Sequence, residues 1–555
     1  ITDVIFSEED IEEGLLSIKA NSATGPDGMP ALFVRKLAKP LSRPLAKIWR
    51  TSLDSGIIPG VFLKGTISPI FKGGDKSDPK NYRPVTVTSV ISRAFEKIIR
   101  RELVSYLEER NLSNEGQHGF RAGHSCLTQL LEHYDNILRN LAEGNRVDVL
   151  YLDFAKCFDK IDIGILMHKL HMLGIGGKIG VWLHSFLTKR TMLVKVGDNS
   201  STEREVKSGL PQGTCLGPLL MTIMNIDIDK EVKNTSVGSF ADDSKATGAY
   251  RNKQEHENYM RDIETIYEWA HKNNMTFNDK KFVLLRYGLE NQVEEDDYKY
   301  EVVGPTGQII QASQSARDLG VQMNCDTTFT EHIEKTVSSC RTVIGMILRS
   351  FHTREELPMM TLYRALVLSK LDYCSPLYFP RQIGGMRAIE KVQADFTRRI
   401  TSMKKPEESR PFDYWERLKK LRLYSVERRV ERYSAIFIWK VKNNVTRNPG
   451  FEFVDTGRRG TMVKISIKKN ESARENSFLV WGAKVFNALP RELRDFHSDA
   501  RDQPTAFKTA LDSFLQCVPD EPNLTPLYSS RMACVDQNGR KTNSLIYTIP
   551  RMLNL

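Results

Sequence analysis

The 555-residue sequence lacks the features of several large classes of protein. No uninterrupted apolar run approaches the roughly 20 residues that a membrane-spanning helix needs, so we expect no membrane among its partners. The eight cysteines include no Cys-x-x-Cys pair, and His124-Ser125-Cys126 is a lone short pair. This spacing indicates free thiols in an intracellular protein, not a zinc site or a disulfide framework. No repeat of fixed period is present, which excludes a solenoid.

The start and the composition of the chain limit the remaining classes. The sequence opens with Ile1 and shows no signal peptide, so we expect a fragment of a longer polyprotein. Hydrophobic residues make up 40% and charged residues 27%, which is typical of a globular protein. The length suggests two to four domains.

The positive charge is concentrated in one stretch. Lys and Arg exceed Asp and Glu by 80 to 69, and residues 381–444 hold 17 basic and 8 acidic side chains. Lys419, Lys420 and Arg422 lie in an amphipathic part of this stretch that we expect to be helical. Such a face either binds a phosphate backbone through counterion release or is simply a solvated surface.

Two predicted strands end at carboxylates. The stretch Val147–Leu152, whose side chains are mostly apolar, precedes Asp153 and is typical of a buried strand. The run Val237–Phe240 precedes Asp242-Asp243, which predicts a β-hairpin with the acids at its tip. Carboxylates from two strand ends can hold two Mg²⁺ ions for an in-line phosphoryl displacement. The alternative is that the Asp pair lies in a solvated turn.

A glycine- and proline-rich loop, Ser208–Pro218, lies between the two acidic sites. Pro211 fixes its own φ, and Gly209 and Gly213 allow a close backbone approach to a ligand. We expect a largely apolar helix over Leu219–Ile228. The loop alone could be a structural connection, so the order strand and acid, glycine-rich loop and helix, acidic hairpin is the informative feature.

In this order of motifs, the chain resembles the reverse transcriptases of non-LTR retrotransposons, in their jockey-like and chicken-repeat-like branch. Tyr151–Asp159, Ser208–Pro218 and Phe240–Asp243 are similar to the three central polymerase signatures of that family. Further segments resemble its other motifs: Gly25–Gly28, Ile70–Asp75, Asn81–Val85, Gln117–Arg121, Met275–Lys281, Asp318–Val321 and Leu371–Tyr373. The similarity runs from residue 1 to about residue 440.

The resemblance implies an α+β right-hand polymerase with a mostly helical basic extension and a small C-terminal segment. The expected divisions are fingers over 1–145, a palm over 146–325, a helical thumb and basic extension over 326–445, and a partly irregular C-terminal segment over 446–555. We expect the palm to be one sheet covered on one face by helices.

The family's catalytic residues correspond to Asp153, Asp242 and Asp243. The resemblance implies two Mg²⁺ ions, with Mn²⁺ as a substitute, bound by Asp153, Asp242 and the backbone oxygen of Phe154. Asp243 either contacts a metal or stabilises the hairpin by accepting backbone N–H bonds.

The nucleotide-binding residues follow from the same motifs. Lys72 and Arg83 are candidates for triphosphate contacts, and Gln212 with Gly213 is expected to lie beneath the new base pair. Phe158 matches the aromatic residue that excludes a ribose 2′-hydroxyl, which favours a DNA product, although a core Phe is the alternative. Lys281 corresponds to a lysine that protonates pyrophosphate, with Lys280 as a competitor.

The function implied is an RNA-directed DNA polymerase that copies retrotransposon RNA from a primer in nicked target DNA. Its expected partners are an RNA template, a DNA primer, dNTPs and an endonuclease domain upstream of this sequence, and its expected location is nucleus and cytoplasm. Two alternatives remain open. One is a group II intron-type maturase, and the other is a catalytically decayed nucleic-acid-binding remnant.

Overall fold

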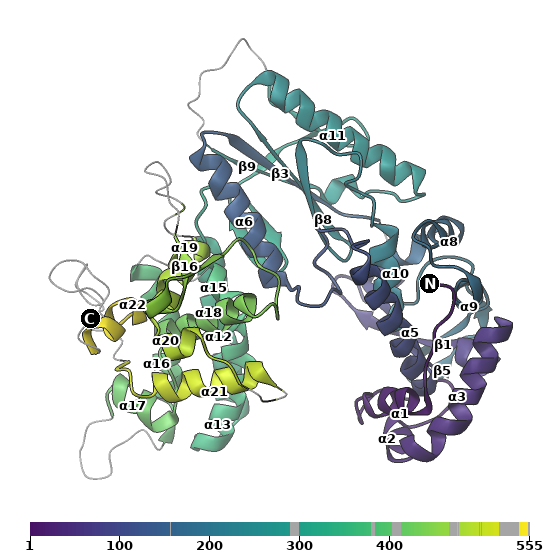
Figure 1. Cartoon of the computed structure of the whole chain (residues 1–555), viewed down its shortest axis with the longest axis horizontal. Coiled ribbons are helices and arrows are strands. Elements are labelled where there is room, and N and C mark those ends of the chain that lie inside the picture. Colours follow the sequence, from purple (N-terminus) through teal and green to yellow (C-terminus); the bar gives the residue numbers. More distant parts are fainter. Residues whose placement is uncertain are drawn as a thin grey trace.

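The structure is a computed structural model that describes residues 1–155, 157–288, 299–378, 383–401, 412–465, 474, 477–498, 500, 502–520 and 543–552. The chain forms an arch in which a central sheet joins an N-terminal arm to an arm built from the later helices (Figure 1). Three clusters of buried apolar side chains stabilise these parts. Within the described ranges, no helix is long and apolar enough to cross a membrane.

The N-terminal arm consists of helices packed beside a small sheet. Its helices and strands, in chain order, are α1 Glu8–Leu16, α2 Ala31–Lys36, α3 Ala38–Ser55, α4 Gly60–Leu63, β1 Lys64–Phe71, β2 Tyr82–Thr88 and α5 Val90–Glu109. Ser7 begins α1 with a capping box, in which its side chain and that of Asp10 each accept a backbone N–H. The rings of Trp49 and Phe95 stack 4.3 Å apart in the first core.

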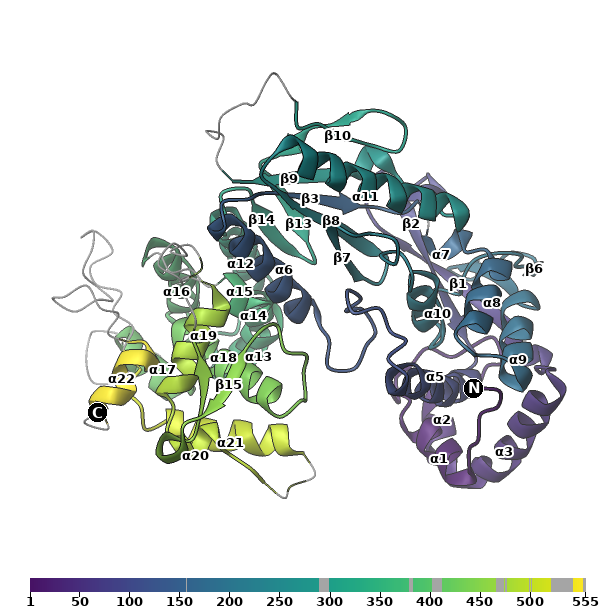
Figure 2. The same ribbon diagram turned by 45° about the horizontal axis from the view of Figure 1, so that its top comes forward.

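Strand β1 pairs with β2 in antiparallel register and with β4 (Thr191–Val196) in parallel. Two short strands, β5 (Asn199–Ser200) and β6 (Arg204–Glu205), pair with β4. Helices α8 (Ile163–Met172) and α9 (Gly177–Thr188) cover the first core beside this sheet (Figure 2).

The central sheet has the order β12-β9-β3-β8-β7. Its strands are β3 Arg146–Leu152, β7 Thr235–Phe240, β8 Asp243–Tyr250, β9 Val283–Tyr287 and β12 Ala312–Ser313. Helix α11 (Lys253–Lys272) contacts β7 and β8, and α6 (Cys126–Ala142) contacts β3 and β7. Two short strands, β10 (Val302–Val303) and β11 (Ile309–Ile310), pair with each other nearby.

The expectation that helices cover this sheet on one face is wrong. Leu150 and Leu152 belong to the same core as the apolar side of α11, whereas Val147 and Val149 belong to the core that includes α6. Alternate residues of β3 therefore face two different cores, because successive side chains of a strand point to opposite faces. A strand buried on both faces contains mostly apolar residues, and in β3 the buried exception is Asp148, which pairs with Arg286.

The acidic motifs lie close to this sheet. The short helix α7 (Cys157–Lys160) follows β3, and α10 (Gly217–Met224) follows the glycine-rich loop. Helix α10 begins two residues before the predicted start and ends four before the predicted end, because Pro218 occupies its first turn and Asn225 is its C-terminal cap.

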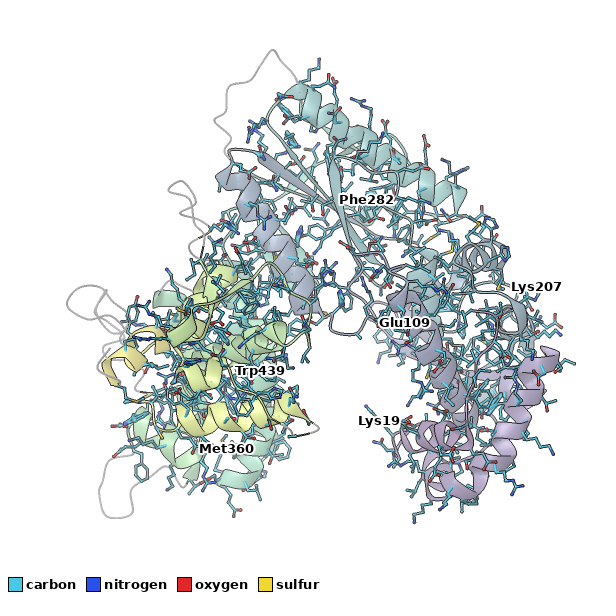
Figure 3. The ribbon with its side chains drawn as sticks, in the orientation of Figure 1. Lys19, Glu109, Lys207, Phe282, Met360 and Trp439 are labelled. Carbon is cyan, nitrogen blue, oxygen red and sulfur yellow. The ribbon has the colours of Figure 1, made fainter. Side chains whose placement is uncertain are left out.

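The second arm is mainly helical. It begins with the hairpin β13 Ser315–Asp318 and β14 Val321–Asn324, followed by α12 Thr330–Ser350, α13 Glu356–Leu362, a π-helical segment Tyr363–Leu368, α14 Ser369–Asp372, α15 Ser375–Tyr378, α16 Ile383–Thr397, α17 Tyr414–Leu421 and α18 Val426–Lys442. Met360 is buried in the third core, and Trp439 of α18 stacks on Phe507 in the second (Figure 3).

The C-terminal part packs against α18. Its described helices and strands are β15 Glu452–Asp455, β16 Thr461–Lys464, α19 Phe478–Ala488, α20 Arg491–Arg494, α21 Gln503–Leu515 and α22 Leu545–Met552. The three predicted domain boundaries stay predictions. The part of the C-terminal segment over 521–542, which was expected to be irregular, lies outside the described residues.

Candidate functional site

Asp153 follows the last residue of β3 and is held there by its backbone. The amide of Asn278 donates to the carbonyl oxygen of Asp153 at 2.8 Å, and Ala155 donates to Thr276 at 2.8 Å. Between these bonds, the rings of Phe154 and Phe277 stack 4.5 Å apart. The carboxylate of Asp153 is therefore fixed at the end of the central strand, next to the start of β8.

Asp242 and Asp243 lie at the tip of the β7–β8 hairpin, as predicted. Phe240 pairs with Asp243, so Ala241 and Asp242 form the turn. Burial raises the pKa of Asp243, with smaller contributions from the carboxylates of Asp242, Asp318 and Asp153. The three catalytic candidates therefore lie close enough to interact electrostatically.

A cavity of about 900 Å³ lies at the acidic residues and is also lined by the glycine-rich loop and by the N-terminal arm. Ten residues predicted from sequence line it: Lys72, Arg83, Asp153, Phe154, Phe158, Gln212, Gly213, Asp242, Asp243 and Lys281. They come from five separate parts of the chain, and folding brings all ten to one site.

The glycine-rich loop is wedged between β2 and α7. A Cβ at Gly209 (φ +78°) would lie 2.6 Å from the carbonyl oxygen of Phe158, and one at Gly213 (φ +114°) 2.5 Å from that of Thr86. The amide of Thr86 donates to the carbonyl oxygen of Gln212 at 2.6 Å. The Gln212 side-chain amide donates to Asp159 at 3.1 Å. Both glycines are therefore required by close contact with the protein's own backbone.

Three of the cations that line the cavity were predicted from the sequence. Lys72 and Arg83 are exposed side chains, and among the described residues neither has a carboxylate partner within salt-bridge distance. Lys281 lies in a short 3₁₀ turn, Asp279–Lys281, and its Nζ is 3.0 Å from Asp153 Oδ2. Its sequence neighbour Lys280 does not line the cavity. Geometry thus separates two lysines that the sequence left as competitors.

Phe158 has two environments. Its side chain is half-buried against the first core and also lines the cavity. Helix α7 places it in the turn that follows Asp153, on the same side as Gln212 and Gly213. In this one position, the Phe158 ring can both pack against the core and contact the sugar of a nucleotide in the cavity.

The residues that line the first cavity suit a divalent cation that takes only a few of its ligands from the protein. The carboxylates of Asp153 and Asp242 line the cavity, and no donor in the described part of the chain reaches the carbonyl oxygen of Phe154. The described residues contain no group of three or more His, Cys, Asp or Glu side chains arranged to hold a metal. Mg²⁺ commonly uses only one or two carboxylates and takes its other ligands from water and substrate phosphates.

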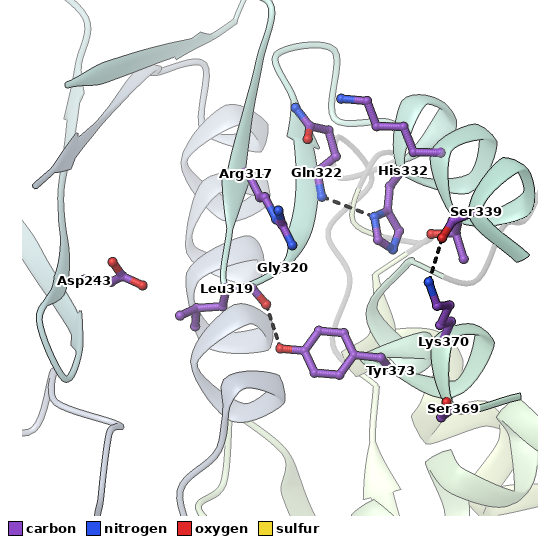
Figure 4. A pocket seen from close by; sticks show the side chains of 12 residues that line it. Asp243, Arg317, Leu319, Gly320, Gln322, His332, Ser339, Ser369, Lys370 and Tyr373 are labelled. Atoms are coloured by element: carbon purple, nitrogen blue, oxygen red, sulfur yellow. Dashed lines mark hydrogen bonds between the residues drawn. The ribbon is translucent and has the colours of Figure 1, made fainter. Parts of the chain in front are cut away.

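Asp243 does not show the expected hairpin-stabilising bonds. Its carboxylate accepts no hydrogen bond from any residue that the structure describes, and it lines a second cavity as well as the first. This second cavity, of about 920 Å³, extends towards α12 and α14 (Figure 4). Asp243 therefore lies between the two cavities.

The second cavity is lined by cations and hydroxyl groups. Arg317, Lys335 and Lys370 contribute the cations, and Ser339 accepts a hydrogen bond from Lys370 at 2.7 Å (Figure 4). The Tyr373 hydroxyl donates to the carbonyl oxygen of Leu319 at 2.7 Å. Lys335 and Lys370 were not predicted as site residues, since lysines on amphipathic helices resemble any solvated lysine.

Asp318, at the end of β13, contacts the two strands next to the catalytic candidates, β3 and β8. Asp318 forms a buried ion pair with Lys245 of β8 and lies 3.5 Å from the hydroxyl of Tyr151. The turn that borders the second cavity is therefore anchored to the sheet that carries Asp153 and Asp243.

The predicted nucleic-acid-binding residues lie away from these cavities. Lys419, Lys420 and Arg422 are exposed at the end of α17, where Lys419 lies 4.1 Å from the centre of the Trp415 ring. Lys419 and Arg422 line a separate cavity of about 750 Å³.

Other cations of the same basic stretch are internal. Arg428 is fully buried in α18, and buried Arg429 pairs with Asp372 at 2.7 Å. The two alternatives for the basic stretch were that its cations bind a phosphate backbone or that they face solvent. Neither holds for Arg428 and Arg429, because both side chains are buried. Their partners come from distant segments, which a local charge count does not reveal.

Comparisons with known proteins agree with this geometry. Residues 72–323 match the family model described as reverse transcriptase (RNA-dependent DNA polymerase). The ten sequence-predicted residues that line the first cavity all fall within residues 72–323.

The chain is similar to several transposon proteins. The chain is 26% identical over 408 residues to the probable RNA-directed DNA polymerase from transposon X-element of Drosophila melanogaster, covering 71% of this chain and 44% of that protein. It is 22% identical over 405 residues to the RNA-directed DNA polymerase from mobile element jockey of the same fly, covering 71% and 43%. The chain thus spans less than half the length of these curated relatives.

The predicted family resemblance is confirmed by these matches, and the fold is the expected mixture of α-helices and β-sheets. Among solved structures, an apo telomerase from Candida tropicalis truncated from its C-terminal domain is similar over 52% of this chain and 59% of that chain. Its sequence identity is 16% and its TM-score 0.33.

Proposed function

We propose that this chain is an RNA-directed DNA polymerase that extends a DNA primer along an RNA template by two-metal nucleotidyl transfer. The observation that carries the proposal is the single cavity in which Asp153 and Asp242 face Lys72, Arg83 and Lys281. Such a set of charges suits a triphosphate, because phosphoryl transfer depends mainly on positioning and charge neutralisation.

The carboxylates of Asp153 and Asp242, with the carbonyl oxygen of Phe154, would hold two Mg²⁺ ions. When bound, these ions lower the pKa of a primer 3′-hydroxyl and neutralise the charge on pyrophosphate. Mn²⁺ has similar ligand preferences and would substitute.

The remaining residues of the cavity bind and orient the nucleotide. Lys72 and Arg83, which have no carboxylate partner among the described residues, are free to contact the β- and γ-phosphates. Lys281, whose Nζ lies 3.0 Å from Asp153, would give a proton to the leaving pyrophosphate. Phe158 would contact the sugar and exclude a 2′-hydroxyl, while Gln212 and Gly213 would lie beneath the base pair.

The second cavity supports the path of the primer. Its cations and hydroxyl groups suit a phosphate backbone, and Asp243 connects it with the nucleotide cavity. The primer end would therefore lie at Asp243, beside Asp153 and Asp242.

The wider biological setting is also a proposal. Since the related transposon proteins are more than twice as long as the matched part, we propose that the full protein carries an upstream endonuclease domain that nicks target DNA. The template would be the retrotransposon's own RNA. Synthesis in the nucleus and translation in the cytoplasm would follow from that role.

Primer extension on poly-rA with an oligo-dT primer tests the activity directly. We expect dTTP incorporation that needs Mg²⁺ and is lost in Asp242→Asn, while binding of the primer–template is kept. Binding without incorporation under Mg²⁺ and Mn²⁺ would overturn the proposal in favour of a non-catalytic RNA-binding protein.

A further inference from the structure

A segment outside the named strands continues the central sheet beyond its edge strand β7. Ser239 of β7 donates its backbone N–H to Gly116 at 2.9 Å and accepts the N–H of His118 at 2.9 Å. Gln117 and Ser239 thus form a parallel bridge. A Cβ at Gly116 would lie only 2.2 Å from the carbonyl oxygen of Val237, so the approach depends on glycine.

The Gln117 side chain binds the turn at the hairpin tip. Its Oε1 accepts the backbone N–H of Ala241 at 2.9 Å and that of Gly119 at 2.8 Å. Its Nε2 lies 3.4 Å from the carbonyl oxygen of Ala241, to which it donates. Gln117 is 2% exposed, so water does not compete for these bonds.

The turn needs such a partner. Ala241 has φ +61°, a left-handed conformation that is unfavourable for a residue with a Cβ. Strained backbone of this kind persists only where the surrounding structure determines it strongly. Asn225 is the other side chain that donates to the Ala241 carbonyl, at a longer 3.5 Å.

We propose that Gln117 is a positioning residue for Asp242. By fixing both backbone polar groups of Ala241, it sets the direction in which the next residue presents its carboxylate to the cavity. The inference rests on the proposed function, since it assigns Gln117 to the site where Asp153 and Asp242 bind divalent cations.

The segment that carries Gln117 is itself anchored. His118 Nε2 lies 2.8 Å from Glu132 of α6, and Arg447 pairs with the other oxygen of Glu132 at 2.7 Å. The backbone of Arg447 also donates to Gly123 at 2.9 Å. Gln117 therefore connects the turn to a fixed frame and not to a free loop.

The test compares Gln117→Met with Gln129→Met in the full 555-residue chain. Methionine keeps the length of the side chain and removes its hydrogen bonds. Gln129 is the matched control, because it is also buried and lies beside Gly238 of β7, yet it makes no hydrogen bond to the turn. The readout is Mn²⁺ binding followed by electron paramagnetic resonance, without dNTP, together with kcat and KM for dTTP.

We expect Gln117→Met to weaken Mn²⁺ binding and lower kcat by about tenfold each, the size typical of a residue that orients a metal ligand. The KM for dTTP and the affinity for primer–template should stay unchanged, and so should every quantity in Gln129→Met. Unchanged Mn²⁺ binding in Gln117→Met would overturn the inference, as would an equal loss in Gln129→Met.

Asp242→Asn separates this inference from the proposed function. If Asp242→Asn also keeps Mn²⁺ binding, the proposed metal site fails; if only Gln117→Met keeps it, the positioning role alone fails. Should Gln117→Met not fold, hydrogen exchange of the unmodified protein decides. The Ala241 amide should be protected although it lies in a turn, and rapid exchange there would overturn the inference.

Discussion

The ammonium group of Lys281 lies 3.0 Å from the carboxylate of Asp153, the residue that follows the central strand of the sheet. Asp153 is about one-third exposed and Lys281 nearly two-thirds, so water screens this ion pair. Such pairs contribute roughly 0–1 kcal/mol, which a bound divalent cation easily exceeds. The lysine can therefore leave Asp153 for a phosphate when substrate binds.

The first prediction distinguishes the two adjacent lysines. Lys281→Met should lower the rate of single-nucleotide incorporation about a hundredfold, because it removes a general acid from the cavity. Lys280→Met is the control and should change the rate little, since Lys280 does not line the cavity. Rapid-quench measurements of both variants check this. Equal decreases of the rate in both variants would show that the rate depends on the structure of the turn and not on the ammonium group of Lys281.

The second prediction concerns the carboxylates. Asp153→Asn and Asp242→Asn should each reduce dNTP addition by at least about two decades, or about 2.7 kcal/mol, because each removes a charge from the metal site. Primer–template affinity should remain. Retention of more than about a tenth of the rate in Asp242→Asn would contradict the assignment.

A third prediction concerns the sugar. Phe158→Val keeps the site apolar but removes the ring, so ribonucleotides should enter more easily. The ratio of kcat/KM for rNTP over dNTP should rise by about one decade or more, at about 1.4 kcal/mol for each decade. Single-nucleotide incorporation with both substrates measures it. An unchanged ratio would mean that Phe158 serves only the core against which it packs.

The motifs in the sequence were enough to predict which residues line one cavity together. Strand ends, glycines and acidic pairs are local signals, and all ten residues predicted for the nucleotide cavity line one cavity. Ser89 begins α5 and Ser7 begins α1 through side-chain caps, which are also local. Features fixed by a few neighbouring residues are therefore readable from one sequence.

Long-range partners were not readable in this way. The bonds from Gln117 to Ala241 join residues 124 positions apart, and the pair of Arg429 with Asp372 joins residues 57 apart. A glutamine in a loop or an arginine on a helix has no local feature that names its partner. The same reason explains why the second helical cover of the sheet was missed.

The fourth prediction concerns the exposed cations of α17. Changing Lys419, Lys420 and Arg422 to Gln should weaken binding of unrelated RNAs about equally, if these residues contact phosphates. It should also flatten the slope of log K against log salt by up to about 0.7–0.9 for each phosphate that is no longer neutralised. Titrations at three salt concentrations measure the slope.

The matched control for this triple variant changes Lys36, Lys39 and Lys47 to Gln. These are also exposed and helical, but they lie on α2 and α3 of the other arm. A parallel shift without a change of slope in the α17 variant would indicate an effect on folding. A decrease confined to one RNA would indicate recognition of a specific element, as in an intron maturase.

The last prediction concerns Glu96 of α5, whose carboxyl group binds the backbone of the glycine-rich loop. Its Oε2 accepts the backbone N–H groups of Cys215 and Leu216 at 2.8 and 3.3 Å, just before α10. Burial raises the pKa of Glu96 from about 4.5 to about 7, although these two donors act to lower it. The folded protein therefore prefers the protonated carboxyl group.

The sign of the pH dependence follows from this shift. The contribution of Glu96 to stability is fully present below pH 4.5 and is lost as the pH rises towards 7, because the unfolded chain releases the proton first.

Glu96→Gln keeps an oxygen acceptor for Cys215 and Leu216 but cannot ionise. Relative to the unmodified protein, it should gain up to about 3 kcal/mol between pH 4.5 and 8. Thermal unfolding midpoints at pH 5 and pH 8 check this. Glu96→Met, which removes the acceptor, should instead be destabilised at both pH values, and an identical pH dependence in Glu96→Gln and the unmodified protein would show that Glu96 does not titrate in this range.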